Sequence, residues 1–495
     1  MNTSIHTPAS TAVSATVLPA RAVCERALRE ADATYDGRFF VGRQIGGEQV
    51  YCRPMCTLPG VQGAFYATAG AAWEQGRVPC GHCQADLAAP LPEWVVDDPV
   101  LVRALRLLAS GFLNQQVEAA LAARLELTGD DLTRRFARAF DCAPTSMAVL
   151  QRAALARRLL QNSQLGQARV AAHAGYRNLA QMRRELNEVY AQSPLKLRGE
   201  RQGGRSRVTL HVPLRAPYHF DWLFGYLRKR ALPGVEEVSG APGAWSYQRA
   251  LAAGQGSGST PGWVIVQPSS QLEFGQPGLS VDLPLLDQYP VWDLLYRAGR
   301  VFDAHLDGHH VQTFLLRQPG LAEWARQAPG LRVAGAWDGY ETAVRAVLGQ
   351  QVSVARGTVL ANKMIQQYGD GQFPQAAQLQ HREVAELGMP GRRGRAVQAL
   401  ARLVDAGALV ADDTCHYDTQ QQGLLAIEGI GPWTANYVRM RVSKDVNAFP
   451  DNDWVVLKQL QCTAAQARRI AADWSPWRAY ALMYLWYAAA QKKMT

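Results

Sequence analysis

The sequence predicts a multidomain protein with four folded parts, in the order small α+β, all-α, α+β and all-α. Its 495 residues exceed what one core holds, at roughly 100 to 200 residues per domain. Three features mark the parts: closely paired cysteines near the start, Ala-, Leu- and Arg-rich stretches of helical periodicity, and short alternating segments between those stretches. The expected limits are a disordered tail over residues 1–20 and domains over residues 21–92, 96–200, 207–322 and 323–495.

The composition indicates a polyanionic partner and argues against a membrane or disulfide-built protein. Lys plus Arg number 52 against 42 Asp plus Glu, which gives a formal charge of +10. No apolar run is long enough to span a bilayer, and residues 1–20 lack the basic start of a secretory signal. Only four of the eight cysteines stand at short paired spacings, which is not the pattern of a disulfide framework. We therefore expect a cytoplasmic protein.

The four paired cysteines predict a metal site in the first domain. Cys52 and Cys56 form a C-x3-C pair, and Cys80 and Cys83 form a C-x2-C pair. Each pair can present two thiolates from one turn toward a shared tetrahedral Zn²⁺, which would stabilise a domain with a small core. The alternative is four unrelated buried cysteines, but two short pairs seldom arise together by chance. We expect a small zinc-bound α+β domain with one four-cysteine site.

The residues around these cysteines, YCRPMC and GRVPCGHC, resemble the amino-terminal domain of Ada-type alkylation-response proteins. This resemblance implies that Cys52 accepts a methyl group from a DNA phosphotriester while the other three cysteines hold the metal. Converting one thiolate into a thioether would reduce the negative charge of the site and raise its affinity for DNA. A purely structural zinc is the alternative. The segment CTLPGVQG, which begins at Cys56, departs from the basic continuation usual in the family, and this departure would weaken phosphate contact.

The helical stretch over residues 96–200 contains two amphipathic patterns in which a first helix would brace a second, arginine-bearing helix. The arginines that would face DNA are Arg134 and Arg135 in the first pattern and Arg183 and Arg184 in the second. Their spacing and the closing SPLKLR resemble the AraC-type tandem helix-turn-helix reader. The alternative is a plain helical spacer, because arginines on a helix usually form a solvated face.

The carboxyl-terminal half contains G-I-G-P in LLAIEGIGPWTANYVRMR, a sequence that can turn one helix into the next. Pro432 would occupy the first helical position and leave backbone N–H groups free to bind a phosphate, as in a helix-hairpin-helix. Asp453 follows in AFPDNDWVVLKQL, where an acidic residue could also simply cap the helix that begins at Trp454.

These motifs, together with AWDGYETAVRAVLGQQVSV and SPWRAYALMYLWY, resemble AlkA-type 3-methyladenine DNA glycosylases over residues 208–487. The resemblance implies an α+β AlkA-type amino-terminal domain and an all-α helix-hairpin-helix glycosylase domain with Asp453 as the catalytic carboxylate. The aromatic residues expected to form the pocket for the flipped base, rather than core, are Trp433, Tyr437, Trp486, Tyr226 and Tyr487. The residues expected to contact DNA are Gly429, Ile430 and Gly431, with Gln351 filling the vacated stack.

The expected function is a monofunctional DNA glycosylase for bases of the 3-methyladenine and 7-methylguanine class, fused to a methyl-accepting transcription regulator. Bifunctional helix-hairpin-helix glycosylases have a lysine that forms a Schiff base at the position where this chain has Trp433. The resemblance therefore implies that base removal is hydrolytic. Cys415 and Cys462 are too few for an iron-sulfur cluster, and no PCHR motif for O6-alkylguanine repair is present. The alternative is a non-enzymatic regulator. Expected partners of this nucleoid-associated monomer are damaged and promoter double-stranded DNA and RNA polymerase, with no membrane.

Overall fold

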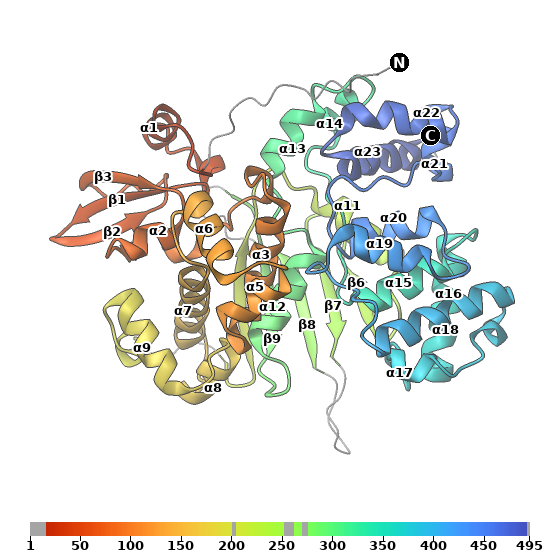
Figure 1. Ribbon diagram of the computed structural model, residues 1–495, viewed down its shortest axis with the longest axis horizontal. Coiled ribbons are helices and arrows are strands. Elements are labelled where there is room, and N and C mark those ends of the chain that lie inside the picture. Colours follow the sequence, from red (N-terminus) through yellow and green to blue (C-terminus); the bar gives the residue numbers. More distant parts are fainter. Residues whose placement is uncertain (1–15, 200–203, 252–261, 270–275, 493–495) are drawn as a thin grey trace. The chain divides into compact units, whose positions relative to one another are not determined.

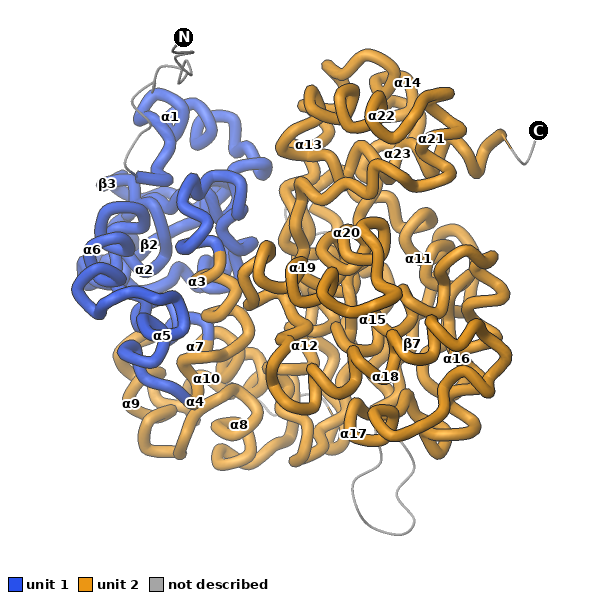
Figure 2. Tube along the Cα trace, turned by 45° about the vertical axis from the view of Figure 1, so that its right-hand side comes forward, with its two compact units in different colours: residues 1–102, 116–151 blue, residues 103–115, 152–495 orange. Residues whose placement is uncertain are grey.

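The computed structural model describes residues 16–199, 204–251, 262–269 and 276–492 (Figure 1). The chain divides into two compact units (Figure 2): unit 1 comprises residues 1–102 and 116–151, and unit 2 comprises residues 103–115 and 152–495. Most of the predicted tail, residues 1–15, lies outside the described residues, whereas the N–H of Val17 donates to the carbonyl of Ala139. Among the described residues, no helix combines the length and apolar character needed to cross a membrane.

Unit 1 begins with a small α+β domain built around a four-stranded sheet in the order β3-β1-β2-β4. Tyr51 and Phe40 pack edge-to-face in its core beside the cysteines. Strand β4 pairs in parallel with β2, which places the second cysteine pair next to the end of β2. The elements are α1 (Arg21–Arg29), η1 (Ala33–Tyr35), β1 (Phe40–Ile45), β2 (Glu48–Cys52), β3 (Val61–Tyr66), α2 (Ala69–Glu74), β4 (Val78–Pro79), η2 (Ala85–Leu87) and η3 (Glu93–Val95).

The first helix-turn-helix lies in unit 1 and consists of α5 (Glu118–Arg124) and α6 (Gly129–Phe140), followed by the start of α7 (Pro144–Asn162). The side chain of Thr128 accepts the N–H of Asp131 and so begins α6. The hydroxyl of Thr68 donates to the carbonyl of Phe140 at 3.0 Å, and Glu74 accepts the N–H of Ala143 at 2.8 Å. The small α+β domain is therefore hydrogen-bonded to the end of the helix α6.

The second helix-turn-helix lies in unit 2 and consists of α8 (Gln167–His173) and α9 (Leu179–Tyr190). The side chain of Asn178 caps α9 by accepting the N–H of Gln181 at 2.8 Å. Arg152 on α7 forms a buried ion pair of 3.0 Å with Glu185 on α9. The other helices of this region in unit 2 are α3 (Pro99–Ala109, from residue 103 onward), α4 (Phe112–Gln115) and α10 (Pro194–Arg198).

The α+β part of unit 2 is an antiparallel sheet in the order β5-β9-β8-β7-β6. Alternating residues of its strands, such as Val264 and Val266 on β8, are fully buried, as a sheet with one covered face requires. The elements are β5 (Arg207–Pro213), α11 (Phe220–Arg228), β6 (Glu236–Ser239), β7 (Ser246–Ala250), β8 (Trp263–Pro268), β9 (Gly278–Pro284), α12 (Val291–Val301), α13 (Gly308–Leu315) and α14 (Ala322–Gln327).

The remainder of unit 2 is helical, with one group of helices at α15–α20 and a second group in which α21–α23 lie beside α13 and α14 (Figure 1). The elements are α15 (Gly339–Leu348), α16 (Val354–Tyr368), α17 (Ala376–Leu379), η4 (Val384–Leu387), α18 (Gly391–Asp405), α19 (Tyr417–Leu425), α20 (Pro432–Arg441), α21 (Trp454–Leu460), α22 (Ala464–Ile470), η5 (Ala471–Trp474) and α23 (Arg478–Gln491). The described chain thus has the four kinds of fold in the predicted order.

Candidate functional sites

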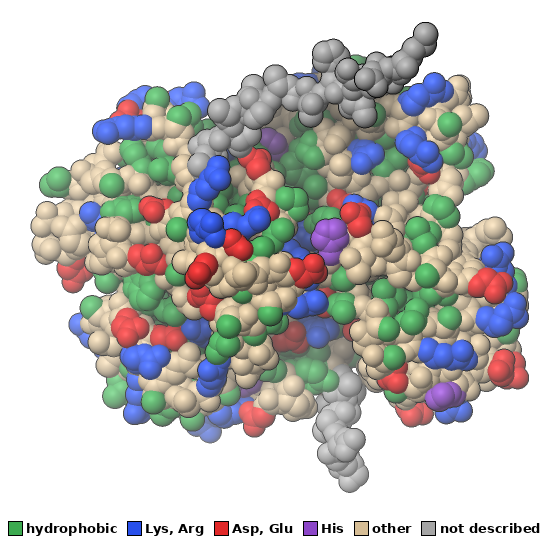
Figure 3. Space-filling view, in the orientation of Figure 1, with side chains coloured by type: hydrophobic (Ala, Val, Ile, Leu, Met, Phe, Trp, Pro, Cys, Tyr) green, Lys and Arg blue, Asp and Glu red, His purple; other side chains and the backbone are tan. Residues whose placement is uncertain are grey.

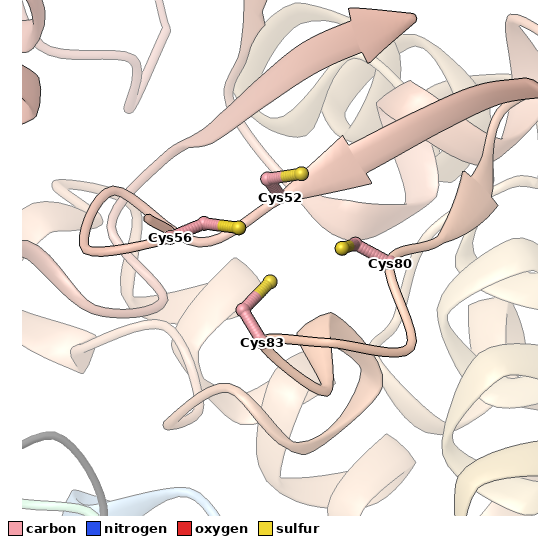
Figure 4. A group of neighbouring side chains, drawn as sticks. All are labelled: Cys52, Cys56, Cys80 and Cys83. Atoms are coloured by element: carbon pink, nitrogen blue, oxygen red, sulfur yellow. The ribbon is translucent and has the colours of Figure 1, made fainter. Parts of the chain in front are cut away.

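The four paired cysteines converge on one point in unit 1, with their sulfurs directed toward one another (Figure 4). All four sulfur atoms lie within 4.8 Å of one another and all four residues are buried. A tetrahedral zinc site with Zn–S bonds of about 2.3 Å needs sulfurs at such separations. Cys52 ends strand β2, Cys56 follows in the next turn, and Cys80 and Cys83 flank the turn after β4. The donor set and its geometry fit one Zn²⁺.

A buried ion pair supports the loop that carries the first two cysteines. Arg53 binds Asp36 through two hydrogen bonds, Nε to Oδ1 at 2.8 Å and Nη2 to Oδ2 at 2.6 Å. Its backbone N–H donates to the sulfur of Cys83 at 3.4 Å. Burial does not distinguish Cys52 from the other cysteines, because its exposed fraction is 0% and that of Cys56 is 6%. The choice of Cys52 as methyl acceptor therefore depends on its place in YCRPMC.

Asp453 lies in unit 2, where helices α20, α21 and α23 meet. Its Oδ1 accepts the backbone N–H groups of Val455 and Val456 at 3.0 and 3.1 Å and so caps α21. The indole N–H of Trp433 on α20 donates to Oδ2 at 2.9 Å, and that of Trp486 on α23 donates to Oδ1 at 3.3 Å. Four N–H donors thus stabilise a negative charge on a side chain that is 6% exposed. The predicted helix-capping role and the predicted aromatic neighbours occur together.

Two tyrosines extend this group of aromatic residues. The rings of Trp433 and Tyr437 are stacked with centroids 5.2 Å apart, and the hydroxyl groups of Tyr437 and Tyr226 are 2.8 Å apart. Arg441, one turn further along α20, donates to both hydroxyl groups, at 2.7 and 3.0 Å. Burial opposes ionisation of Tyr437, but Arg441 and Arg230 outweigh it and lower its pKa to about 8.

Tyr487, the remaining predicted pocket residue, contacts a different set of rings. It packs edge-on against Trp222 and Trp324 at centroid distances of 5.7 and 6.3 Å. The structure records no hydrogen bond or ring contact between Tyr487 and Asp453 or Trp433 among the described residues. Of the predicted pocket residues, Trp433, Tyr437, Trp486 and Tyr226 are brought together with Asp453, and Tyr487 is not.

The predicted hairpin joins α19 to α20. Gly429 has φ of +96°, and a Cβ atom there would lie 3.1 Å from the Cβ of Ala396, so this turn favours glycine. The side chain of Ile430 is buried in the core, its backbone N–H donates to the carbonyl of Ile427 at 3.0 Å, and Gly431 precedes Pro432 at the start of α20. Glu428 lies 3.6 Å from Arg392, which offsets the negative charge beside the hairpin.

Gln351 and its neighbour Gln350 lie in the turn between α15 and α16. Gln351 is exposed and has φ of +53°, in the left-handed region that a non-glycine residue seldom adopts. Gln350 donates to the carbonyl of Gly429 at 3.0 Å and to the hydroxyl of Thr434 at 2.9 Å. The sequence interpretation missed Gln350, which binds this turn to the hairpin.

The arginines predicted to read DNA are exposed on α6 and α9. Arg134 pairs with Asp131, Arg135 lies 2.5 Å from Asp98, and Arg184 lies 3.7 Å from Glu188. Arg183 donates to Gln167 at 3.0 Å. Basic and acidic side chains are interspersed on the face shown in Figure 3. The positive charge of the chain is therefore not gathered on one patch of that face.

Arg441 also belongs to the site, although it was not among the residues predicted from the sequence. A signal was present, because Arg441 follows Tyr437 by four residues and so lies on the same face of a helix. The pattern of residues does not show that both side chains reach Tyr226, which lies 211 positions from Tyr437 in the chain.

Comparison with known proteins matches three parts of the chain to family models. Family models match for the metal binding domain of Ada over residues 23–86, a helix-turn-helix domain over residues 121–200 and the AlkA N-terminal domain over residues 209–338. The Ada match and the four converging sulfurs together confirm the predicted Zn²⁺ site. They also confirm the predicted order of metal-binding, helix-turn-helix and AlkA-type parts.

Related chains match either nearly all of this chain or a little more than half of it. DNA-3-methyladenine glycosylase 2 of Escherichia coli is 32% identical over 55% of this chain and 94% of its own length. A solved 3-methyladenine DNA glycosylase of Archaeoglobus fulgidus overlays with a TM-score of 0.47 and 17% identity over 57% of this chain and 98% of its own length. The probable bifunctional transcriptional activator/DNA repair enzyme AlkA of Mycobacterium tuberculosis is 32% identical over 94% of this chain and 95% of its own length. The chain therefore belongs to this family of bifunctional transcriptional activators and DNA repair enzymes, with a DNA glycosylase fused to an Ada-type metal-binding domain and a helix-turn-helix domain.

Proposed function

We propose that unit 2 removes alkylated bases of the 3-methyladenine and 7-methylguanine class from duplex DNA by hydrolysis, with Asp453 as the catalytic carboxylate. The observation that carries this proposal is the position of Asp453, whose carboxylate is held by the indole N–H groups of both Trp433 and Trp486. As the N-glycosidic bond breaks, positive charge develops on the sugar, and a fixed carboxylate nearby stabilises it. Alkylation has already made the base a cationic leaving group, so a strong general acid is not required.

The aromatic side chains beside Asp453 suit a flipped, positively charged purine. Stacked indole and phenol rings attract a cation through their π faces, and Trp433 and Tyr437 are already parallel, at an interplanar angle of 14°. The backbone of residues 429–431 would bind the DNA strand at the start of α20, and Gln351 would fill the space left by the flipped base. We also propose that Tyr487, which packs on Trp222 and Trp324 and not on Trp433, is an outer residue that a bound base would reach.

The test is release of free 3-methyladenine and 7-methylguanine from methylated duplex DNA by the full chain and by Asp453→Asn. Asparagine caps helices about as well as aspartate, so the variant keeps α21 while it removes the negative charge. We expect a loss of roughly 100-fold or more in the single-turnover rate, the size found when one transition-state charge partner is removed. Asp451→Asn is the matched control because Asp451 pairs with Arg468 at 2.6 Å instead. Equal rates for wild type and Asp453→Asn would disprove the proposal.

The reaction would end at an abasic site without strand cleavage. The position that would need a lysine holds Trp433, and Lys458 on α21 has its Nζ 5.0 Å from the ring of Trp454. Borohydride traps the Schiff base formed by a lyase. We expect no covalent protein–DNA product in borohydride, whereas a trapped product that disappears in Lys458→Met would contradict a purely hydrolytic enzyme.

In unit 1 we propose that Cys52 accepts a methyl group from a DNA methylphosphotriester. A bound Zn²⁺ keeps its ligand sulfurs deprotonated at neutral pH. The Cys52 sulfur would attack the methyl carbon, an S–C bond would form, the O–C bond would break, and the phosphodiester anion would leave with the electron pair. The product is a thioether at Cys52 and a repaired phosphate.

Peptide mass spectrometry after incubation with methylphosphotriester DNA tests this proposal. We expect one added methyl group on the peptide that contains Cys52 and Cys56, with fragmentation placing it on Cys52. Cys24→Ser is the control, since Cys24 is buried outside the metal group. Methylation of Cys56 or Cys80 instead would show that another ligand is the acceptor.

The remaining partners follow from these two activities. Methylated unit 1 would bind promoter DNA through Arg134 and Arg135 on α6, and Arg183 and Arg184 on α9 would contact the same duplex. Contact with RNA polymerase would then give activation. We further propose that the protein acts in the cytoplasm on the nucleoid, because both sites require chromosomal DNA. We also propose that it is a monomer. Phosphate contact by these arginines predicts binding that weakens as salt concentration rises, which a salt series of DNA-binding measurements would check.

A further inference from the structure

A short segment outside the glycosylase part contacts the end of the helix that carries Trp433 and Tyr437. The segment is residues 103–115, which lie between the Ada match and the helix-turn-helix match and belong to unit 2. Arg106 on α3 donates through Nη1 to the carbonyl of Ser443 at 2.6 Å and through Nη2 to the carbonyl of Lys444 at 3.1 Å. Its exposed fraction is 6%, so this guanidinium is buried in the contact.

The carbonyl groups that Arg106 binds follow directly after α20, which ends at Arg441. Both carbonyls lie in the turn just after the C-cap residue Val442, and a cation near the carboxyl end of a helix is favourable. Arg300 on α12 donates to the preceding carbonyl, that of Val442, at 2.9 Å. Two arginines from two different helices therefore hold the turn of residues 442–444 that follows α20.

Further contacts keep the segment in place on unit 2. Arg103 donates to the carbonyl of Thr414 at 2.7 Å, and the indole of Trp292 on α12 donates to the carbonyl of Ala109 at 3.1 Å. The guanidinium of Arg106 also lies 5.3 Å from the ring centre of Tyr417 at the start of α19. The segment thus contacts three separate parts of the glycosylase half.

We propose that Arg106 is a positioning residue for base removal, which holds the carboxyl end of α20 so that Trp433 stays against Asp453. The inference rests on the proposed function of Asp453. A displacement of about 1 Å in a catalytic group can lower a rate by roughly 100-fold, so a small shift of α20 is sufficient to be measured. Lys444 is held separately by Asp303, at 2.5 Å, so the loop keeps a second attachment when Arg106 is removed.

The experiment compares Arg106→Ala, Arg106→Lys and Arg103→Ala in the full, zinc-loaded chain. Single-turnover release of 7-methylguanine, with protein in excess over DNA, gives the rate of the chemical step, and the dependence of that rate on protein concentration gives the affinity. We expect Arg106→Ala to lower the rate about 10-fold, equivalent to about 1.4 kcal/mol, with unchanged DNA affinity. Arg106→Lys should recover part of the rate because an ammonium group can donate to one of the two carbonyls. Arg103→Ala is the matched control: it removes the hydrogen bond to the carbonyl of Thr414 and leaves Arg106 on the carbonyls of Ser443 and Lys444, so it should match wild type.

The outcomes separate this inference from the proposed function. Wild-type chain that releases no base would overturn the function itself. Active wild type with Arg106→Ala equal to Arg103→Ala would overturn the positioning role. The positioning role would also be overturned if Arg106→Ala lowered the rate and the thermal midpoint together and Arg106→Lys recovered neither. The effect would then be general destabilisation.

Discussion

The zinc site and the carboxylate site of this chain are assembled in opposite ways. The four cysteines span residues 52–83, and two short pairs bring their sulfurs within 4.8 Å of one another. The carboxylate site draws Trp433, Asp453 and Trp486 from three helices, and the hydroxyl that completes it comes from Tyr226, 211 positions before Tyr437. A local site depends on its own turn geometry, whereas a distributed site depends on the packing of a whole unit.

Removal of the metal should show the largest difference between the two sites. Chelation of Zn²⁺ should unfold the first domain of unit 1, because metal binding in such small domains supplies about 10–16 kcal/mol. Base release should be unchanged, since Asp453, Trp433 and Trp486 all belong to unit 2. Limited proteolysis of residues 21–92 and a base-release assay on the same sample measure both. Loss of base release on chelation would show that the sites are coupled.

The ion pair behind the zinc site should give the next largest effect. Asp36→Ala leaves the guanidinium of Arg53 buried without its carboxylate, a change that typically costs about 3–5 kcal/mol. The first domain should then require more zinc to fold, as a zinc titration followed by circular dichroism would show. Glu25→Ala removes the exposed pair with Arg21 in the same domain and should have little effect. Equal effects of both variants would contradict the assigned importance of burial.

Unit 2, whose packing assembles the carboxylate site, contains buried charges that predict sensitivity to acid. Glu341 on α15 lies between Arg249 on β7 and Arg345, which overcome the effect of burial and lower its pKa to about 2. Because the pKa in the folded state is below that of an unfolded glutamate, about 4.3, this group contributes stability above pH 4.3. The contribution of about 3 kcal/mol should disappear as pH falls from 4.3 toward 2.

Urea unfolding of wild type and Glu341→Gln over this pH range measures the contribution. The difference in unfolding free energy between the two should shrink as pH falls. Glu323→Gln is the matched control, because Glu323 forms an exposed pair with Arg326, and its difference from wild type should be small at every pH. A Glu341→Gln difference that is independent of pH would contradict an ionised Glu341.

The same contrast explains what could be predicted from the sequence. The cysteine set needed only spacing and ligand chemistry, whereas Asp453 and its two tryptophans came from the resemblance to AlkA-type glycosylases. Contacts between distant segments could not be predicted from the sequence. The pattern of residues does not indicate that Arg441 contacts Tyr226 or that Arg106 contacts the turn after α20. Tyr487 is the opposite case, a residue next to a site residue in the sequence but not in space. It follows Trp486 directly, yet it packs on Trp222 and Trp324, because successive residues of a helix point in different directions.

The smallest effect concerns Tyr437, whose environment is set by arginines from two segments. Arg441 and Arg230 lower its pKa to about 8 against the opposing effect of burial, below the value of about 10 for an unfolded tyrosine. Ionised Tyr437 therefore stabilises the folded state. This contribution is complete above pH 10 and is lost as pH falls from 10 through 8. Ultraviolet absorbance should show one tyrosine ionising near pH 8, and Tyr437→Phe should remove that step. Burial raises the pKa of Tyr340, so Tyr340→Phe should leave the step unchanged. If the absorbance step near pH 8 persisted in Tyr437→Phe, it would come from another tyrosine. The two arginines would then not lower the pKa of Tyr437, and their hydrogen bonds and charges would affect the distributed site less than the structure indicates.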